Sequence, residues 1–213
     1  MALQNDLDAI HGNIQSNIPE EAALFDADTD EMIRKGVGGE ALRVGDVAPD
    51  FTLPDHLGRE VSSVELRKKG ALVISFYRGS WCPYCNMELR ALQQRLTQIN
   101  QLGASLVAIS PQVPDESLGT AQKNELAFPV LSDAGNVVAK RFGLVFVLSE
   151  HLRPVYSKFG IDLPKYNGNQ SFELPVPATY VLDRNGLVLK QHVSADYKQR
   201  MEPEQILEVL TEL

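Results

Sequence analysis

Cysteine is scarce: the chain of 213 residues has only two, Cys82 and Cys85. Two cysteines cannot make the disulfide framework on which small secreted domains depend, and in a reducing cytosol both would rest as thiols. Their placement three positions apart therefore points to a role other than a structural crosslink.

Long hydrophobic runs are also missing. No stretch approaches the roughly 20 apolar residues that a membrane-spanning helix needs, and residues 1–6 have neither the basic start nor the apolar stretch of a secretion signal. We therefore expect a soluble, cytoplasmic protein.

Positive charge is in deficit, since 20 Lys and Arg residues face 28 Asp and Glu residues, which gives a formal net charge of -8 and a pI near 5.0. Phosphate backbones and anionic lipid surfaces would repel such a chain. The composition therefore excludes nucleic acid and membranes as expected partners.

The first 42 residues look different from the rest, with many acids and apolar residues at helical spacing. The repeating apolar positions of a first helix are Leu3, Leu7, Ile10, Ile14 and Ile18. Pro19 marks the start of a second helix, which we expect to run to about Ile33 before glycines interrupt it. We predict an N-terminal helical arm over residues 1–42, which caps the main domain at 43–213 or makes a dimer contact.

From Val44 onward, short apolar runs alternate with amphipathic stretches, which is typical of the strands and crossover helices of an α/β sheet. The expected strands cover 71–77, 106–109, 128–131, 179–182 and 187–189. The expected helices cover 87–102, 115–126, 137–142 and a last segment from about 203. Residues 183–186 have the composition of a hairpin turn between the two last strands.

The segment between Leu144 and Pro175 is rich in aromatic residues, Gly, Asn and Pro. It is too long for an ordinary connection in a compact domain. We predict a functional loop with one helix.

The chemistry centres on the passage Phe76-Tyr77-Arg78-Gly79-Ser80-Trp81-Cys82-Pro83-Tyr84-Cys85, in which a buried strand ends and a helix begins. The unpaired N–H groups and the dipole at a helix N-terminus favour an anion, so a thiol placed there ionises more readily. A free cysteine is about 3% thiolate at pH 7, whereas a pKa of about 6 gives roughly 90%. Pro83 suits the first helical turn, and the spacing lets both sulfurs share one disulfide.

Two further roles for the pair are less favoured. Two cysteines can simply pack as small buried apolar residues. A zinc half-site needs two more ligands, but the four histidines are scattered without paired spacing, at His11, His56, His151 and His192. We expect no metal and no cofactor.

Neighbouring residues complete the predicted site. Trp81 is placed to shield the redox pair, and Arg78 is either a solvated charge or a thiolate-stabilising group. Pro177 comes just before a strand, where we predict a cis peptide bond, although a plain loop-ending proline would give the same pattern. The predicted substrate contacts are Trp81, Pro83, Tyr84, Pro177 and Thr179.

Several motifs together resemble the peroxiredoxins of the alkyl hydroperoxide reductase and thiol-specific antioxidant family. They begin with Gly45-Asp46-Val47-Ala48-Pro49-Asp50-Phe51-Thr52-Leu53 and continue through the cysteine loop, 128–133 and 179–186. The Trp-Cys-Pro-Tyr-Cys motif, by contrast, is similar to thioredoxins and glutaredoxins. The resemblance implies a thioredoxin fold of peroxiredoxin type, α/β, with a mixed central sheet flanked by helices.

Laid on this chain, the family's loop places the peroxidatic cysteine at Cys85, its helper threonine at Cys82 and its proline at Arg78. The family's helper arginine falls near Pro177, which instead matches the cis-proline of thioredoxins. The usual helpers that hold the peroxide are therefore replaced, and we hypothesise that Arg78 supplies the lost charge. Helix geometry favours Cys82 as the attacking thiol and the alignment favours Cys85, which we prefer.

The resemblance implies a thiol peroxidase that reduces hydrogen peroxide or organic hydroperoxides through a sulfenic acid and a Cys82–Cys85 disulfide. Thioredoxin, glutaredoxin or glutathione would restore the thiols, and the family suggests a homodimer. One alternative is a thiol-disulfide oxidoreductase with Cys82 as nucleophile. A redox-inert binding module that uses residues 144–175 is the second alternative.

Overall fold

The computed structural model describes residues 2–213, which are built around a five-stranded mixed sheet. The strands follow one another across the sheet as β5 (Val130–Ser132), β4 (Ser105–Ser110), β3 (Leu72–Phe76), β8 (Ala178–Leu182) and β9 (Val188–Val193). Strands β3, β4 and β5 are parallel, and β8 is antiparallel to both β3 and β9. The predicted α/β class and the mixed central sheet are confirmed.

Apolar residues on both faces of the sheet are the reason that helices cover it on two sides. In β3, Leu72, Ile74 and Phe76 pack into one core, whereas Val73 packs into the other, as the alternation of side chains along a strand requires. One core is completed by the helices α4 (Pro83–Gln101), α5 (Pro114–Lys123) and α9 (Pro203–Thr211). The other is completed by α6 (Val137–Arg141), which follows the 3-10 turn η1 (Ala134–Asn136), and by Leu66 of α3 (Ser63–Lys69).

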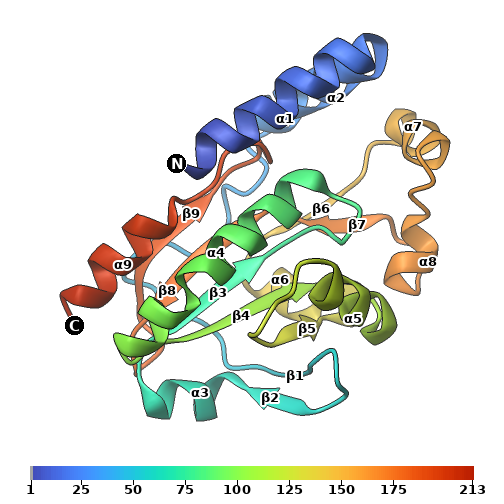
Figure 1. Cartoon of the computed structure of the whole chain (residues 1–213). Helices are drawn as coiled ribbons and strands as arrows, with labels where there is room; N and C mark the ends of the chain where they lie inside the picture. Colours follow the sequence, from blue (N-terminus) through green and yellow to red (C-terminus); the bar gives the residue numbers. More distant parts are fainter. Residues whose placement is uncertain (1) are drawn as a thin grey trace.

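The N-terminal arm is a pair of helices, α1 (Leu3–Asn17) and α2 (Pro19–Arg34), close to the predicted bounds. Figure 1 shows the pair lying across the end of the domain, beside the first turns of α4 and the chain after β9. Leu3 and Leu7 are buried in the core that α4 forms, and Glu202 accepts hydrogen bonds from the Leu3 and Gln4 N–H groups, each at 2.8 Å. The arm therefore packs on the main domain, while a role in dimerisation stays a prediction, as does the division at residue 42.

The segment 144–175 contains more structure than predicted. Its ends pair as antiparallel strands, β6 (Val145–Val147) and β7 (Glu173–Pro175). Between them lie the 3-10 turn η2 (Glu150–Leu152) and two helices, α7 (Arg153–Lys158) and α8 (Leu163–Asn167). The prediction of a single helix is wrong because Pro154 and Pro164 each lie in the first turn of a separate helix, and Gly160, with φ 72°, lies between the two.

Other differences from the sequence prediction are local. The short hairpin of β1 (Thr52–Pro54) and β2 (Glu60–Ser62) was not predicted, because three-residue strands leave little periodicity to detect. Helix α4 begins at Pro83, directly after its N-cap Cys82, as the cysteine passage predicts, whereas the apolar periodicity indicated the helix only from Met87.

The predicted cis bond before Pro177 is wrong, because the described residues contain no cis peptide bond. Pro177 lies between Pro175, the last residue of β7, and Ala178, the first of β8. The chain runs almost continuously as strand here, and a trans bond, the form favoured by about 0.5–1 kcal/mol for proline, accommodates it.

Candidate functional site

Cys82 and Cys85 lie where β3 gives way to α4, at the junction that the sequence indicates. Cys82 is the N-cap residue of α4, and its sulfur accepts a hydrogen bond from the Cys85 N–H at 3.3 Å. Both cysteines are free thiols without exposed surface. The first turn of the helix therefore directs its dipole and an N–H group at the Cys82 sulfur, which favours the thiolate there.

Arg78 supplies a positive charge next to this sulfur. Its Nη2 donates to Cys82 Sγ at 3.4 Å and its Nη1 donates to the Tyr156 hydroxyl at 3.3 Å. The guanidinium carbon lies 3.9 Å from the ring centroid of Tyr197 and 5.2 Å from that of Trp81. These aromatic faces hold the buried cation in one position, so the proposed thiolate-stabilising role of Arg78 has a geometric basis.

A second buried arginine, Arg200, lies on the other side of the pair and was not predicted. Its Nη2 is 3.7 Å from Cys85 Sγ, and its Nε donates to Glu88 at 2.7 Å. Glu88 also accepts a hydrogen bond from Thr179 Oγ1 at 2.9 Å. Thr179 thus reaches the cysteines through Glu88, and its predicted contact with substrate stays a prediction.

The buried charges balance when one thiol is ionised. Arg78 and Arg200 carry two positive charges, and Glu88 with one thiolate carries two negative charges, all on side chains that are nearly inaccessible to solvent. An uncompensated buried charge is costly. The buried charges then sum to zero, so the reduced protein favours the form in which one of the two cysteines is a thiolate.

The pKa values separate the two thiols. Burial opposes ionisation of Cys82, but the hydrogen bond from Cys85 and the charges of Arg78 and Arg200 outweigh it and lower the pKa of Cys82 to about 5. Burial raises the pKa of Cys85 well above its ordinary value, as do its hydrogen bond to Cys82 and the negative charge of that sulfur. Cys82 is thus the favoured thiolate and Cys85 the favoured thiol.

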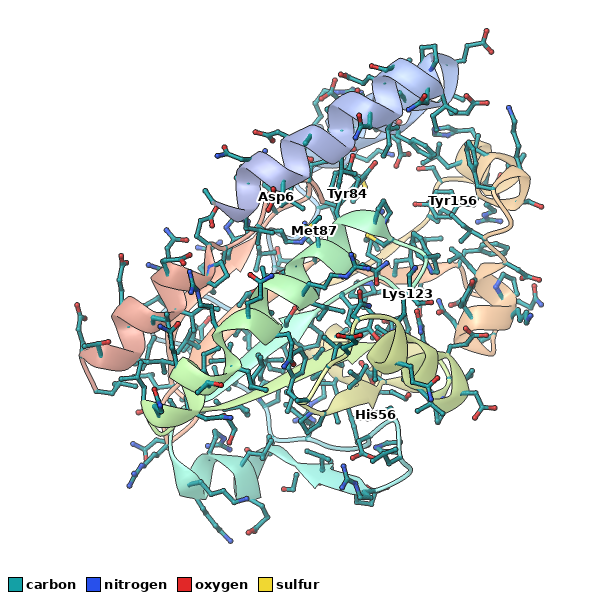
Figure 2. The ribbon with its side chains drawn as sticks, viewed as in Figure 1. Asp6, His56, Tyr84, Met87, Lys123 and Tyr156 are labelled. Carbon is teal, nitrogen blue, oxygen red and sulfur yellow. The ribbon has the colours of Figure 1, made fainter. Side chains whose placement is uncertain are left out.

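The loop before Cys82 is held tightly in place. Asn86 Nδ2 donates to the Ser80 carbonyl at 2.8 Å, Lys123 Nζ donates to the same carbonyl at 3.2 Å, and the Ser80 N–H donates to the Gln112 side chain. A Cβ on Gly79 would lie 2.3 Å from Trp81 Nε1, so this position requires glycine. Lys123 is labelled in Figure 2, at the end of α5.

An apolar pocket of about 340 Å³ opens next to the cysteine loop. Three predicted contact residues, Trp81, Pro83 and Tyr84, line it together with Arg78. Figure 2 shows Tyr84 on α4 below the arm and Tyr156 on α7, the helix on another side of this pocket. Among the described residues, Pro177 does not line this pocket. It lies at the junction of β7 and β8.

No group of three or more His, Cys, Asp or Glu side chains in the described part of the chain is arranged to hold a metal ion. None of the helices in residues 2–213 is both long and apolar enough to cross a membrane.

Apart from Glu88, the site residues that the sequence did not indicate reach the cysteines only because the fold brings them there. Arg200 is 115 positions from Cys85, and Tyr156 and Tyr197 come from the segments before α8 and α9. Glu88 was the one detectable member, since it follows Cys85 by three positions and lies on the same helix face.

Comparison with known proteins gives a consistent result. A model described as AhpC/TSA family matches residues 44–191. Peroxiredoxin Bcp of Escherichia coli strain K12 is 31% identical over 103 residues, which cover 48% of this chain and 65% of that protein. The chloroplastic Peroxiredoxin Q of Sedum lineare is 33% identical over 144 residues, which cover 68% of this chain and 65% of that protein. The chain thus spans about 65% of the length of these two relatives.

Solved structures show the same fold. The crystal structure of Peroxidoxin BcpB from Mycobacterium tuberculosis matches with a TM-score of 0.64 and 24% identity, over 81% of this chain and 98% of that one. The reduced 2-Cys peroxiredoxin of Plasmodium vivax matches with a TM-score of 0.61 and 18% identity, over 80% and 81%. These matches confirm the predicted thioredoxin fold of peroxiredoxin type.

Proposed function

Because the chain belongs to the AhpC/TSA family, we propose that it is a thiol-dependent peroxidase that reduces hydrogen peroxide or organic hydroperoxides through Cys82 and Cys85. One observation carries the proposal: a buried thiol caps a helix beside Arg78, and its pKa is lowered to about 5. Such a sulfur is almost fully ionised at neutral pH, and the thiolate is the nucleophilic form.

We assign the first attack to Cys82, although the motif alignment favoured Cys85. The support for Cys82 is its lowered pKa, the Cys85 N–H that points at its sulfur and its contact with Arg78. The Cys82 thiolate attacks the terminal peroxide oxygen and forms an S–O bond. The O–O bond breaks, its electron pair leaves with the other oxygen as alkoxide or hydroxide, and that anion takes a proton to become an alcohol or water.

Cys85 then resolves the sulfenic acid. Its sulfur attacks the Cys82 sulfur, a disulfide forms, and the hydroxyl leaves as water with the Cys85 proton. An external thiol reductant restores both thiols by exchange, and we propose that it is thioredoxin, glutaredoxin or two molecules of glutathione. These reductants fit a reducing compartment such as the cytoplasm, and the family resemblance favours a homodimer.

Both arginines have a place in this sequence of steps. Arg78 stabilises the Cys82 thiolate and faces the pocket through which a peroxide would arrive. Arg200 stabilises negative charge on Cys85 when that thiol loses its proton. They would thereby replace the family helpers that this sequence lacks.

A thiol-disulfide oxidoreductase with Cys82 as nucleophile is the second candidate, because the same lowered pKa suits attack on a disulfide. The burial of Cys82, which has no exposed surface, weighs against it. A protein disulfide would have to displace more of the surroundings than a small hydroperoxide does.

Trapping of the sulfenic acid tests the assignment. The Cys85→Ser and Cys82→Ser variants are each treated with one equivalent of hydrogen peroxide and a sulfenic-acid-specific diketone probe, and intact mass is measured. We expect the probe on Cys82 of the Cys85→Ser variant, whereas label only on Cys85 of the other variant would reverse the roles. Insulin reduction without any peroxide consumption by the unmodified protein would favour the second candidate.

A further inference from the structure

The geometry points to the N-terminal arm as a specificity element: together with the cysteine loop it forms a substrate pocket that selects hydroperoxides with a bulky apolar group over hydrogen peroxide. This inference rests on the proposed peroxidase function and adds a substrate class to it. The arm lies outside residues 44–191, the part that the family model matches.

The pocket has three apolar walls. The arm contributes Ile14, Ile18 and Phe25, from the facing parts of α1 and α2. The cysteine loop contributes Trp81, and the segment after α7 contributes Phe159. Side chains of this kind bind apolar groups by removing their surface from water.

The pocket reaches Arg78, which is one hydrogen bond from the reactive sulfur. Arg78 lines it and also donates to Cys82 Sγ at 3.4 Å, so one side chain connects the apolar space with the thiol. Arg78 Nε is buried and has no hydrogen-bond partner among the described residues. That N–H is therefore an unpaired donor on a residue that lines the pocket.

Polar contacts hold the arm in this position. Lys198 Nζ forms an ion pair with Asp26 at 3.1 Å, and Lys158 forms another with Glu21. The Tyr84 hydroxyl lies 3.4 Å from His11 Nδ1, which joins α4 to α1 directly above the pocket. The apolar wall from the arm is therefore a fixed part of the site.

The size and the apolar lining of the pocket determine which peroxide it prefers. Hydrogen peroxide is far smaller than a space of about 340 Å³ and has no apolar surface to bury. An aromatic or branched alkyl hydroperoxide places its carbon skeleton against the three walls and its O–O group near Arg78. Only the larger substrate gains binding energy from the arm, and that energy can position its peroxide for attack.

The test combines binding with kinetics. Trp81 is the only tryptophan and lines the pocket, so its fluorescence reports occupancy by 2-phenyl-2-propanol, the unreactive alcohol that corresponds to cumene hydroperoxide. Ile14→Phe fills the pocket, and Ile33→Phe makes the same change on an arm residue that is 52% exposed and outside the pocket lining. Phe25→Ala is a second variant that removes wall surface without adding bulk.

We expect saturable quenching or enhancement of Trp81 fluorescence by the alcohol in the unmodified protein and in Ile33→Phe, and a loss of affinity in Ile14→Phe and Phe25→Ala. The ratio of kcat/KM for cumene hydroperoxide to that for hydrogen peroxide should fall by about tenfold in both pocket variants. An unchanged ratio in Ile14→Phe and Phe25→Ala overturns the inference.

The two proposals fail in different ways. If no peroxide is consumed but the alcohol binds as described, the peroxidase function is wrong and the pocket stands as a binding site. If peroxides are consumed but the alcohol does not change Trp81 fluorescence, the pocket inference is wrong and the peroxidase function stands.

Discussion

The guanidinium of Arg78 lies 3.4 Å from the Cys82 sulfur and is fixed against the rings of Tyr197 and Trp81. The contact joins a buried positive charge to a thiol whose negative form it stabilises. The reactivity of Cys82 should therefore depend on this one side chain more than on any other nearby group outside the cysteine pair.

Replacement of Arg78 by methionine should raise the pKa of Cys82, because the side chain stays unbranched and flexible but loses its charge. The thiolate absorbance near 240 nm, followed against pH, should shift to higher pH, and peroxide reduction at neutral pH should fall by roughly tenfold or more. Arg153→Met is the matched control, since Arg153 also stacks on an aromatic ring, that of Phe172 at 4.1 Å. Equal rates for Arg78→Met and the unmodified protein would remove Arg78 from the mechanism.

The stability of the reduced protein should rise with pH over a window set by Cys82. Its pKa falls from an ordinary 9.0 to about 5 in the folded state, so between these values the unfolded chain binds a proton that the folded chain does not. Unfolding free energy should therefore rise with pH by up to about 1.4 kcal/mol per unit across this window, and this contribution is lost as pH falls through 5.

Chemical denaturation at several pH values measures this dependence. Cys82→Ser is the control, because it removes the titrating sulfur and leaves the other buried groups in place. A Cys82→Ser variant with the same pH profile as the unmodified reduced protein would contradict the low pKa.

Loss of the Glu88 charge should destabilise the fold strongly. The Glu88→Gln variant keeps the volume and the hydrogen bond to Thr179 but leaves the Arg200 cation without its partner. Removal of one member of a buried pair costs about 3–5 kcal/mol, whereas Glu204→Gln, at the partly exposed pair with Arg95, should cost under about 1 kcal/mol.

The double variant Glu88→Gln with Arg200→Met shows whether the loss of stability comes from the unpaired Arg200 charge. Urea unfolding gives the free energy of unfolding of each variant. If the unpaired cation is the cause, the double variant should be more stable than Glu88→Gln alone. A double variant that loses the sum of both single effects would show that the two side chains act independently.

The sequence predicted those helices and strands that are specified by residues close together in the chain. The apolar run at 72–76 predicts β3 because a strand covered on both faces must be apolar throughout, and Pro83 after Cys82 predicts a helix that begins at the cysteines. Both the family fold and the place of the redox pair follow from these signals.

The charged residues that surround the cysteines could not be predicted from neighbouring residues in this way. Glu88 and Arg200 are 112 positions apart, and nothing near Arg200 distinguishes it from a surface arginine until the chain after β9 folds back over α4. The arm raised no expectation of chemistry, because Ile14 and Phe25 look like ordinary packing residues until the pocket that they line is seen.

Gly79 gives the most local test of the loop that holds Cys82. A methyl group there would meet Trp81 Nε1 at 2.3 Å and Gln112 Oε1 at 2.7 Å, so Gly79→Ala must displace both the indole and the amide that binds the Ser80 N–H. We expect a loss of about 1–3 kcal/mol in unfolding free energy and a slower reaction of Cys82 with iodoacetamide, because the first turn of α4 shifts with the loop. Gly119→Ala is the control: its Cβ meets nothing within 4 Å inside α5, where alanine should stabilise by about 0.5–1 kcal/mol. If Gly79→Ala were as stable and as reactive as the unmodified protein, the close contact between the loop and Trp81 would have no part in holding the thiol.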